Sequence, residues 1–576
     1  MCGIYGITTG DQRFINDYMH TCSHRGPDGA NKIEIVNRSG NTVTLGHNLL
    51  SIMSEPAKSR QPWRTPKHNY LVYNGEIFNY LELKEKYKDF VDTTGCDTEL
   101  LAWGLDKFGL SFIDEIDSMH GFAYYEVDKD KLTLSRDHAG IKPLYYAQIK
   151  EGLVFGSEIK GMLDKVPDSR KLDNLASSML SKTGTNPLRN TLFTNIKKVL
   201  PGETIVYDLG SQMIDYAKRI YIRPNANQDY NKSELKQMFA DTIKRSSIGI
   251  RKIGVFLSGG LDSSIIAHEL NKIQGTVHTF TNRFEPAVSS DEDYNSDSMI
   301  ASKFAKEQGF DHHDVVISPS EYLSAWDDSI YYMEQPNYNP SNPVYCFTNK
   351  VLSDNEIVIT MAGDMGDELF GGYPKYYNLY HSKEKPNTWK ELLALWMERV
   401  KKGSYPMTEN PINEEVLVDE LEKCYGEELW NPADPTASYM ALDCVAQVPE
   451  QFLTRNDSYG MAYSMEGRFP FASKIFMQYC MNIKSKHKFK GKDTKALIKD
   501  TYKKDLPAYL LYKQKTGWTV PIGYWLMDQV DKKLDRSYDQ NIGKDRLKQL
   551  KRSQKAGKGL IPPWQVKNWK EKYKIK

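Results

Sequence analysis

Paired cysteines, long hydrophobic runs and an excess of charge of one sign are all missing from this sequence. The cysteines stand at positions 2, 22, 96, 346, 424, 444 and 480, an odd number with no CxxC pair. This scatter argues against a disulfide framework and against a zinc site. Six of the seven are interpreted as small, mostly buried apolar side chains. Cys2 is the exception because of its position.

The lack of long apolar runs bears on location. No window approaches the roughly 18 consecutive apolar residues that a membrane-spanning helix needs. The first six residues, Met-Cys-Gly-Ile-Tyr-Gly, offer neither the basic n-region nor the apolar h-region of a signal peptide. The sequence therefore predicts a cytoplasmic protein with no membrane partner.

Charge is balanced over the whole chain, with 76 Lys and Arg against 75 Asp and Glu in 576 residues. This balance gives nucleic acid no support as a partner. Residues 531–576 differ, because 15 basic and 5 acidic residues give them a balance of +10 and leave −9 for the remainder. Gly557, Gly559, Pro562 and Pro563 are expected to interrupt any long helix there. We expect a basic, solvated, partly ordered C-terminal extension.

The texture of the sequence changes once along the chain, and at about 150 residues per domain its length allows two to four domains. Short alternating apolar runs separated by turn residues predict antiparallel strands in residues 1–215. These runs are 42–46, 70–73, 122–127 and 131–135. Residues 223–232 are polar with almost nothing to bury, so we interpret 216–233 as a linker.

Beyond the linker the pattern becomes helix, strand, helix. Ser233 is expected to cap a helix. Its apolar positions, at helical spacing, are Leu235, Met238, Phe239 and Ile243. The apolar run 253–257 then reads as a buried strand, which predicts a parallel α/β domain over residues 234–530. Residues 389–504 are expected to be mainly helical.

Cys2 becomes the first residue if the initiator methionine is removed. Its α-amino group, with a pKa of roughly 7.7 to 8, would then lie next to its own thiol, so that a nucleophile and a base occur in one residue. Taken alone, a cysteine at position two can also be an accident of sequence.

Cys2 is followed, in order, by several distinctive segments. They are 24–28 (His-Arg-Gly-Pro-Asp), 73–80 (Tyr-Asn-Gly-Glu-Ile-Phe-Asn-Tyr), 94–101 (Thr-Gly-Cys-Asp-Thr-Glu-Leu-Leu), 135–146 (Ser-Arg-Asp-His-Ala-Gly-Ile-Lys-Pro-Leu-Tyr-Tyr) and 155–160 (Phe-Gly-Ser-Glu-Ile-Lys). Together they closely resemble the glutaminase domain of class II glutamine amidotransferases, in the asparagine synthetase branch, over nearly all of residues 2–210. The resemblance implies an α+β N-terminal-nucleophile fold with stacked antiparallel sheets between helices.

The resemblance also implies roles for individual residues. Cys2 would attack the amide, Asn74 and the Gly75 backbone would stabilise the oxyanion, and Glu76 and Asp97 would contact the ammonium and amide end of glutamine. A thiolate and a pair of aimed donors are what amide hydrolysis needs. The structural alternatives are a type I′ hairpin turn at Asn74-Gly75 and a helix cap at Asp97. The joint order of the motifs favours the functional interpretation.

One position departs from the family pattern. Members usually carry an arginine immediately before Leu-Ser-Ile, where it pairs with the α-carboxylate of glutamine, but this sequence has Leu49. Such a charge-assisted pair is worth about 1.5 to 3 kcal/mol, so we expect glutaminase activity to survive with a raised KM. The groups left to hold glutamine are the backbones of Ser51, Ile52 and Met53. Arg25 and Arg60 are the candidate replacements for the missing cation.

A second site is predicted where the strand 253–257 runs into residues 258–264, Ser-Gly-Gly-Leu-Asp-Ser-Ser, and an apolar helix. Glycines let the backbone close on phosphate, hydroxyls add donors, and a helix N-terminus adds positive potential. No Gly-Lys-Ser/Thr follows, so this is not a Walker loop. The segment resembles the loop of enzymes that split ATP into AMP and pyrophosphate; the alternative is an ordinary strand-to-helix turn.

An acidic loop supports this assignment. The strand 357–361 leads into a glycine-rich turn with Asp364, Asp367 and Glu368, which would repel one another without a cation or a positively charged substrate. In the family that the chain resembles, Asp262 and Asp367 would bind Mg²⁺, and the position of Asp364 governs formation of the acyl-adenylate. That position is often Glu in asparagine-forming enzymes, and the family prefers Gly at Met365, so both departures bear on the acceptor.

Further matches cover residues 448–453, Asp457, 461–471 and 513–523. Lys515 aligns with the lysine that stabilises the departing pyrophosphate, a role suited to an ammonium point charge; the alternative is one solvated lysine among many. The residues expected to bind the nucleotide are Leu257, Ser258, Gly259, Gly260, Asp262, Ser263, Asn282, Ala362, Gly363 and Lys515.

The sequence thus predicts a two-site amidotransferase that uses glutamine, ATP and Mg²⁺. Ammonia released at Cys2 would travel internally to a carboxylate activated as an acyl-AMP. Aspartate is the favoured carboxylate; a sugar uronate, a peptide or a secondary metabolite is the alternative. A regulatory protein with a spent active site is the rival from another class, for which Leu49 is the only support. A homodimer is left open.

Overall fold

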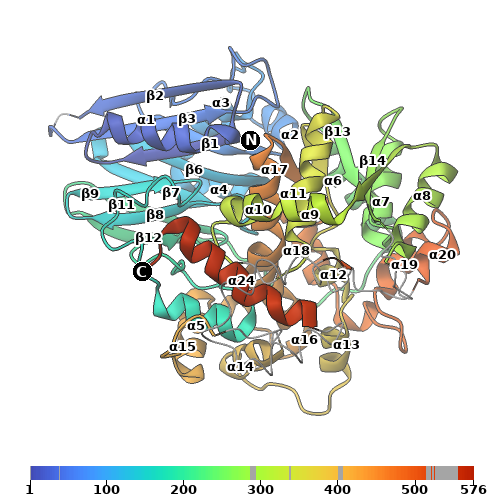
Figure 1. The fold of residues 1–576 in the computed structure, drawn as a ribbon. Coiled ribbons are helices and arrows are strands. Elements are labelled where there is room, and N and C mark those ends of the chain that lie inside the picture. The colour runs from blue at the N-terminus through green and yellow to red at the C-terminus, as the bar shows by residue number, and fades with distance from the viewer. Residues whose placement is uncertain are drawn as a thin grey trace.

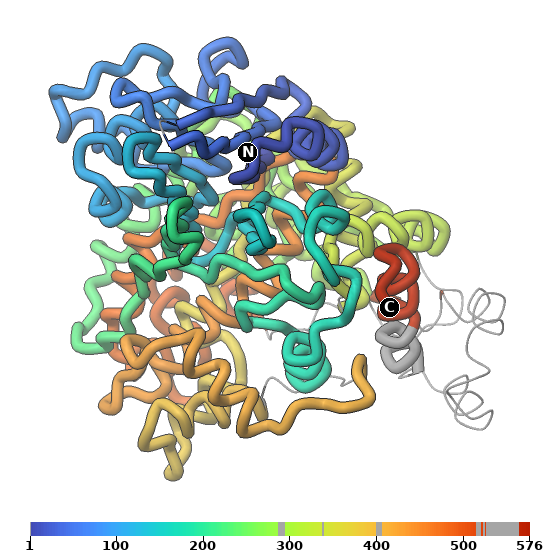
Figure 2. The backbone as a smooth tube through the Cα atoms, turned by 90° about the vertical axis from the view of Figure 1, so that its left-hand side faces the viewer, coloured from blue at the N-terminus to red at the C-terminus, as the bar shows by residue number. Residues whose placement is uncertain are grey.

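The computed structural model describes residues 2–37, 39–285, 294–336, 339–399, 406–513, 520–521, 525 and 556–576. The N-terminal strands lie on the left of Figure 1 and the later α/β part on the right. In the view from the side, the N-terminal segments are at the top and the end of the chain is at the right (Figure 2).

The N-terminal part contains two six-stranded sheets in which all strand pairs are antiparallel. The first has the order β10-β8-β9-β1-β3-β2, with β1 (Cys2–Ile7), β2 (Gly29–Val36), β3 (Thr42–Leu49), β8 (Tyr145–Ile149), β9 (Gly152–Gly156) and β10 (Lys197–Lys198). The second has the order β12-β11-β7-β6-β5-β4, with β4 (Trp63–Arg64), β5 (Tyr70–Ile77), β6 (Ser118–Glu126), β7 (Lys131–Arg136), β11 (Glu203–Asp208) and β12 (Met213–Arg219).

The two sheets pack face to face between helices. Ile4 of β1 belongs to the apolar cluster between the sheets, whereas its neighbour Tyr5 packs under helix α1 (Gln12–Thr21). Helix α3 (Asp97–Phe108) covers the outer face of the second sheet and shares an apolar cluster with β5. Because strand side chains alternate, β1 buries both of its faces. This arrangement confirms the predicted N-terminal-nucleophile fold.

The later part is built on a five-stranded parallel sheet of order β15-β14-β13-β16-β17. Its strands are β13 (Ile253–Phe256), β14 (His278–Phe284), β15 (Asp311–Ile317), β16 (Ile359–Met361) and β17 (Glu466–Arg468). Strands β13 and β16 are neighbours at the centre, so the loops that follow them meet at one edge of the sheet. The predicted phosphate loop and acidic loop are therefore side by side, and the predicted parallel α/β fold is confirmed.

Helices surround this sheet. Those that concern the sites are α6 (Lys232–Ser246), α7 (Leu261–Asn271), α8 (Ser296–Gln308), α10 (Trp326–Met333), α11 (Asn342–Asp354), α12 (Gly366–Phe370), α17 (Thr454–Ala462) and α19 (Ala496–Tyr502). The predicted helical stretch contains, in addition, α14 (Trp389–Arg399), α15 (Glu414–Cys424), α16 (Pro435–Leu442) and α18 (Lys474–Asn482).

The predicted linker 216–233 differs in detail from the structure. Strand β12 continues to Arg219 and helix α6 begins at Lys232, so the linker overlaps an element at each end. The N-cap of α6 is Asn231, whose side chain accepts hydrogen bonds from the N–H groups of Ser233 and Glu234. The prediction of Ser233 as the cap was wrong because Asn caps as well as Ser and stands two residues earlier.

The end of the chain corrects the expectation of a solvated extension. Helix α24 (Ala556–Tyr573) includes both Pro562 and Pro563. Trp569 is fully buried, its indole N–H donates to the carbonyl of Glu334 at 2.9 Å, and its ring packs edge-on against Phe193. Burial of large aromatic side chains outweighs the local helix-breaking composition. Figure 1 shows α24 crossing the front of the molecule at the boundary of its two parts. Residues 526–555 lie outside the described residues.

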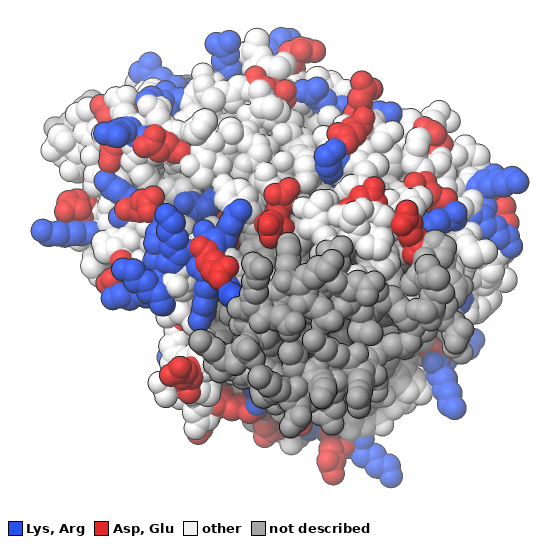
Figure 3. Space-filling model, in the orientation of Figure 1, with Lys and Arg blue, Asp and Glu red and all other residues white. Residues whose placement is uncertain are grey.

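The cysteines and the surface charges can be compared with the sequence expectations of buried thiols and balanced charge. All seven cysteines are free and buried. Basic and acidic side chains alternate over most of the described face in Figure 3, and a group of Lys and Arg gathers near the C-terminus. Among the described helices none is long and apolar enough to cross a membrane.

Candidate active sites

Cys2 lies at the start of β1, opposite Leu49 in the register of β1 with β3. Its thiol faces a narrow cavity of about 30 Å³, and its Sγ is 4.0 Å from the carbonyl oxygen of Leu50. Burial raises the pKa of the Cys2 thiol. A thiol in such a place needs a neighbouring base before it can attack, and removal of Met1 would give Cys2 an amino group that can serve as one.

Asn74 and Gly75 lie inside β5, where they pair with β6, so the hairpin-turn alternative is wrong. The backbone N–H of Cys2 donates to Asn74 Oδ1 at 2.9 Å. This bond fixes the orientation of the amide, and within the described part of the chain no acceptor contacts the buried Asn74 Nδ2. A fixed, buried donor beside the nucleophile is what a developing oxyanion requires. At Gly75 a Cβ would lie 2.2 Å from the carbonyl oxygen of Met119, so no side chain fits.

Asp97 is the first residue of α3, but the N-cap position is Cys96 and no side chain caps this helix. The Asp97 carboxylate instead accepts hydrogen bonds from Tyr73 OH at 3.0 Å and from the Ile77 N–H at 2.9 Å, so the cap alternative is also wrong. Burial raises the pKa of Asp97 to about 6 and raises that of Glu76 well above its usual range. Two buried carboxylates of this kind favour a cationic group between them.

The cavity brings together most of the predicted glutamine-binding residues. Its lining is Cys2, Leu49, Leu50, Ser51, Ile52, Met53, Ser59, Gln61, Tyr73, Gly75, Glu76, Cys96, Asp97 and Thr98. No sequence motif marked Ser59, Gln61, Tyr73 or Thr98 as cavity residues, because only the packing of the sheets and α3 places them there. No Lys or Arg is among the lining residues. Arg25 and Arg60, the candidate replacements for a cation at Leu49, are likewise not among the residues that line this cavity.

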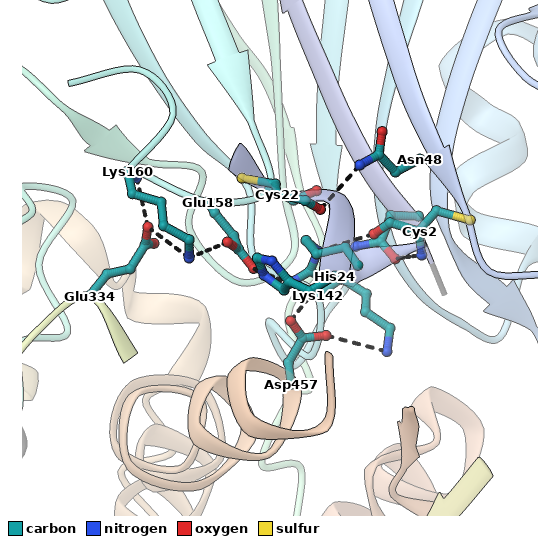
Figure 4. A network of polar contacts seen from close by, with 12 residues as sticks. Cys2, Cys22, His24, Asn48, Lys142, Glu158, Lys160, Glu334 and Asp457 are labelled. Carbon is teal, nitrogen blue, oxygen red and sulfur yellow. Dashed lines mark hydrogen bonds and ion pairs between the residues drawn. The ribbon is translucent and has the colours of Figure 1, made fainter. Parts of the chain in front are cut away.

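Arg25 has a different place, among the polar contacts of Cys2, Glu158 and Asp457, the residues that Figure 4 labels around this network. It is fully buried, and its Nε donates to the carbonyl of Cys2 at 3.2 Å. Its Nη1 donates to Glu158 at 3.0 Å and its Nη2 to Asp457 of α17 at 2.9 Å. The network continues from Glu158 through Lys160 to Glu334. Buried ion pairs thus join the backbone of the nucleophile to the second part of the chain.

The second site is a cavity of about 560 Å³ at the carboxyl edge of the parallel sheet. Of the predicted residues it is lined by Leu257, Ser258, Gly260, Asp262, Asn282, Asp364 and Asp367. An adjoining cavity of about 190 Å³ adds Ser263, Ala362 and Gly363. Gly259 lines neither cavity; its φ is +68° and its carbonyl accepts from Lys513 at 3.4 Å. Lys515 lies outside the described residues.

Lys495 lines this cavity although no sequence motif marked it. Its Nζ lies 2.5 Å from Asp262 Oδ2 and 2.8 Å from Asp367 Oδ1. Burial disfavours the ammonium, but the two carboxylates outweigh burial and raise the pKa of Lys495 above its usual range. Lys495 precedes α19, more than a hundred residues from either loop, so only the tertiary structure shows the three groups together.

Asp262 and Asp367 also sit in a cradle of glycines. A Cβ on Gly366 would lie 2.8 Å from Asp262 Oδ1, and one on Gly372 would lie 1.8 Å from Asp367 Oδ1. The loops therefore admit only backbone beside the two carboxylates. Hard oxygen ligands that already converge on one cation fit Mg²⁺, which prefers carboxylates together with phosphate oxygens.

The other end of this cavity is formed around Asp364. Its carboxylate accepts a hydrogen bond from Asn456 Nδ2 at 3.0 Å and lies 4.0 Å from the guanidinium of Arg455. Burial raises the pKa of Asp364. Arg455 is itself buried and lies over the ring of Tyr345 at 3.8 Å, which brings a positive charge into the cavity. Met365 has a φ of +80°, which explains why glycine is preferred there.

Comparison with known proteins assigns both parts of the chain to families. A family model described as asparagine synthase matches residues 234–568. The chain belongs to the asparagine synthase family. The model of a glutamine amidotransferase domain matches residues 1–218 of the same chain. This member of the family is therefore an amidotransferase ligase, and the rival prediction of a regulatory protein without activity is not supported.

Several named relatives cover most of this asparagine synthase family member. Asparagine synthetase [glutamine-hydrolyzing] 1 of Bacillus subtilis is 26% identical over 92% of this chain and 89% of its own length. Asparagine synthetase B of Escherichia coli is 26% identical, covering 88% of this chain and 78% of its own. The Mus musculus asparagine synthetase is 28% identical over 68% of this chain and 70% of its own.

Proposed function

We propose that this enzyme hydrolyses glutamine at Cys2 and uses the ammonia to amidate aspartate, with ATP converted to AMP and pyrophosphate. The observation that carries the proposal is the pairing of two chemically different cavities in one chain. One presents a thiol beside an oriented amide donor, and the other presents Lys495 between Asp262 and Asp367. We assign the first activity to residues 1–215 and the second to residues 234–530.

In the first cavity, the Cys2 sulfur would attack the side-chain amide carbon of glutamine. Asn74 Nδ2 and the Gly75 N–H would donate to the oxyanion, and Asp97 with Glu76 would hold the ammonium. Once Met1 is removed, the Cys2 amino group would take the thiol proton and pass it to the amide nitrogen, so that the C–N bond breaks, ammonia leaves and a thioester remains. Water then cleaves the thioester to glutamate and restores the thiol.

In the second cavity, the start of α7 offers backbone N–H groups and the hydroxyls of Ser258 and Ser263 to phosphate. Asp262 and Asp367 would hold Mg²⁺, whose chemistry when bound is to neutralise phosphate charge. Lys495 can move from its carboxylates to the pyrophosphate as charge develops on that group. We thereby propose for Lys495 the role of stabilising pyrophosphate that the sequence predicted for Lys515. The role of Lys515 itself stays a prediction.

The acceptor would bind at the Asp364 end. The carboxylate of the acceptor would attack the α-phosphorus of ATP and release pyrophosphate, and ammonia would then displace AMP from the β-aspartyl-AMP. Arg455 supports an acceptor with a second carboxylate, as aspartate has, because a buried guanidinium favours that group. Asp364 and Met365 are the observations that favour a different carboxylate instead.

A screen of carboxylates for AMP formation, with ammonium as the nitrogen source, tests the acceptor. We expect aspartate to give AMP, pyrophosphate and asparagine in equal amounts. AMP formation with a sugar uronate or a peptide, but not with aspartate, would overturn this assignment and leave the glutaminase half unaffected.

A further inference from the structure

The loop that forms one wall of the glutamine cavity, residues 50–53, is held by the second part of the chain. The N–H of Ser51 donates to Asp28 Oδ2 at 2.8 Å. Arg251 donates from Nε to the carbonyl of Ser51 at 2.8 Å and from Nη2 to Asp28 Oδ2 at 2.7 Å. These three bonds close a ring in which the fork of one guanidinium holds both the loop and the carboxylate that supports it.

A backbone contact lies next to this ring. The N–H of Ile250 donates to the carbonyl of Ile52 at 2.9 Å. Gly249 has a φ of +127°, a conformation that favours glycine, and a Cβ there would lie 3.2 Å from both the oxygen and the Cγ2 of Ile52. Residues 249–251 therefore run close along the glutamine loop, and both the backbone conformation and the tight contact at position 249 favour glycine.

The position of these residues in the chain links the two cavities. Residues 249–251 stand immediately before β13, and β13 leads directly into the phosphate loop at Ser258. The residues that hold the glutamine loop thus lie just before the start of β13, and the nucleotide loop follows its end. Leu49 supplies no cation for the α-carboxylate of glutamine. Recognition of glutamine therefore depends more on the backbone of this loop than it would if position 49 were an arginine.

We propose that Arg251 is a positioning residue that fixes the glutamine-binding loop from the second part of the chain and thereby sets the KM for glutamine. The inference rests on the proposed glutaminase activity of the first cavity. Arg251 contacts Ser51 and Asp28 and is not among the residues that line the cavity, so it acts through the loop.

A second ion pair between the same two parts of the chain provides a matched control. Arg245 Nε lies 2.6 Å from Glu82 Oε1, and neither residue lines the glutamine cavity. The exposed fraction of the arginine side chain is similar in the two pairs, 32% for Arg251 and 25% for Arg245. A general weakening of the interface would therefore affect both variants, whereas a role in loop position is specific to Arg251.

The test measures glutamate release against glutamine concentration, and AMP formation against ammonium concentration, in Arg251→Ala and Arg245→Ala. We expect Arg251→Ala to raise the glutamine KM about ten-fold, because two of the three bonds that hold the loop are lost. Its ammonium KM should stay at the wild-type value, and Arg245→Ala should leave both values unchanged. The glutamine KM of Arg251→Lys should lie between those of the wild type and Arg251→Ala, because an ammonium can pair with Asp28 but cannot also hold Ser51 as the guanidinium does.

Gly249→Ala keeps every charge and moves only the backbone, so it should raise the glutamine KM as well, and it serves if Arg251→Ala does not fold. A wild-type glutamine KM in a folded Arg251→Ala would overturn the inference, and if that variant does not fold, a wild-type glutamine KM in Gly249→Ala would overturn it. An equal change in the ammonium KM, or the same change in Arg245→Ala, would also overturn it. A wild-type enzyme that releases no glutamate would instead remove the proposed glutaminase activity, and with it the inference.

Discussion

The two cavities of this molecule solve opposite electrostatic problems. In the narrow glutamine cavity the carboxyl groups of Glu76 and Asp97 are buried and have raised pKa values, although the guanidinium of Arg468 lies 3.3 Å from Glu76. In the wide nucleotide cavity Asp262 and Asp367 already share the ammonium of Lys495. The first cavity is arranged to accept a cation, the ammonium of an amino acid. The second already contains a cation, Lys495, which can bind an anionic substrate.

The cavities also differ in how they are built. Neighbouring strands and the start of α3 place Cys2, Asn74 and Asp97, so their positions follow from strand register. The wide cavity combines loops after β13 and β16 with Lys495, which is remote in sequence. Changes to the narrow cavity should therefore affect one nitrogen source alone, and changes to the wide one should affect both.

Cys2→Ala is expected to separate the activities of the two cavities most strongly. Without the nucleophile, glutamine-dependent amidation should fall by a factor of about 10⁴ or more. Ammonium-dependent amidation should continue at the wild-type rate. Cys346→Ala is the control, since Cys346 is a buried thiol outside both cavities. A parallel loss with both nitrogen sources in Cys2→Ala would contradict the separation.

Lys495→Ala should have the complementary effect. Loss of the cation between Asp262 and Asp367 is expected to lower amidation by about 10² to 10³ with either nitrogen source, as measured by pyrophosphate release. Glutamate release without ATP should not change. Lys503→Ala, which removes a surface ion pair with Asp500, is the control. Full activity in Lys495→Ala together with loss in Lys515→Ala would return the role to Lys515.

The motifs of the glutaminase half could be read from sequence because each lies on one strand or one helix start. Cys2, Asn74 and Asp97 were placed by such segments, and the structure brings them together. Lys495 and Arg251 could not be found in this way. Their partners are far away in the sequence, and no local pattern of a single lysine or arginine encodes a tertiary contact.

The C-terminal helix shows the same limit for the fold. Glycine and proline content predicts an interrupted segment between 557 and 563, whereas α24 is continuous in the structure. Its stability comes from the contacts of Trp569 with Phe193 and Glu334, which belong to the two different parts of the molecule. Tertiary burial overrides local propensity wherever large aromatic surfaces are covered.

The raised pKa of Asp97 predicts how glutamine binding depends on pH. Above about pH 6 the carboxylate is ionised and can pair with the ammonium; below it, protonation removes the pair. Glutamine Kd should therefore increase about ten-fold per pH unit as pH falls below this value. Calorimetry on Cys2→Ala isolates the effect, because this variant has neither turnover nor the Cys2 thiol. A Kd that is constant from pH 7 to about pH 5 would show that Asp97 does not hold the ammonium.

The smallest change in glutamine KM is expected from a substitution at Leu49, where the narrow cavity lacks a cation for the α-carboxylate. Leu49 is buried, lines the cavity and lies opposite Cys2. Leu49→Arg would add a partner for the α-carboxylate of glutamine, and part of the gain is offset by the cost of burying the guanidinium. We therefore expect the glutamine KM to fall about five-fold.

Leu49→Met, with a similar volume and no charge, should leave the glutamine KM unchanged. In the double variant Leu49→Arg with Arg251→Ala, the new cation can bind the carboxylate while the loop is no longer held. If recognition depends on both, the rise in KM caused by Arg251→Ala should be smaller in the Leu49→Arg background than in the wild type. Equal rises in the two backgrounds would mean that the loop and the carboxylate site act independently.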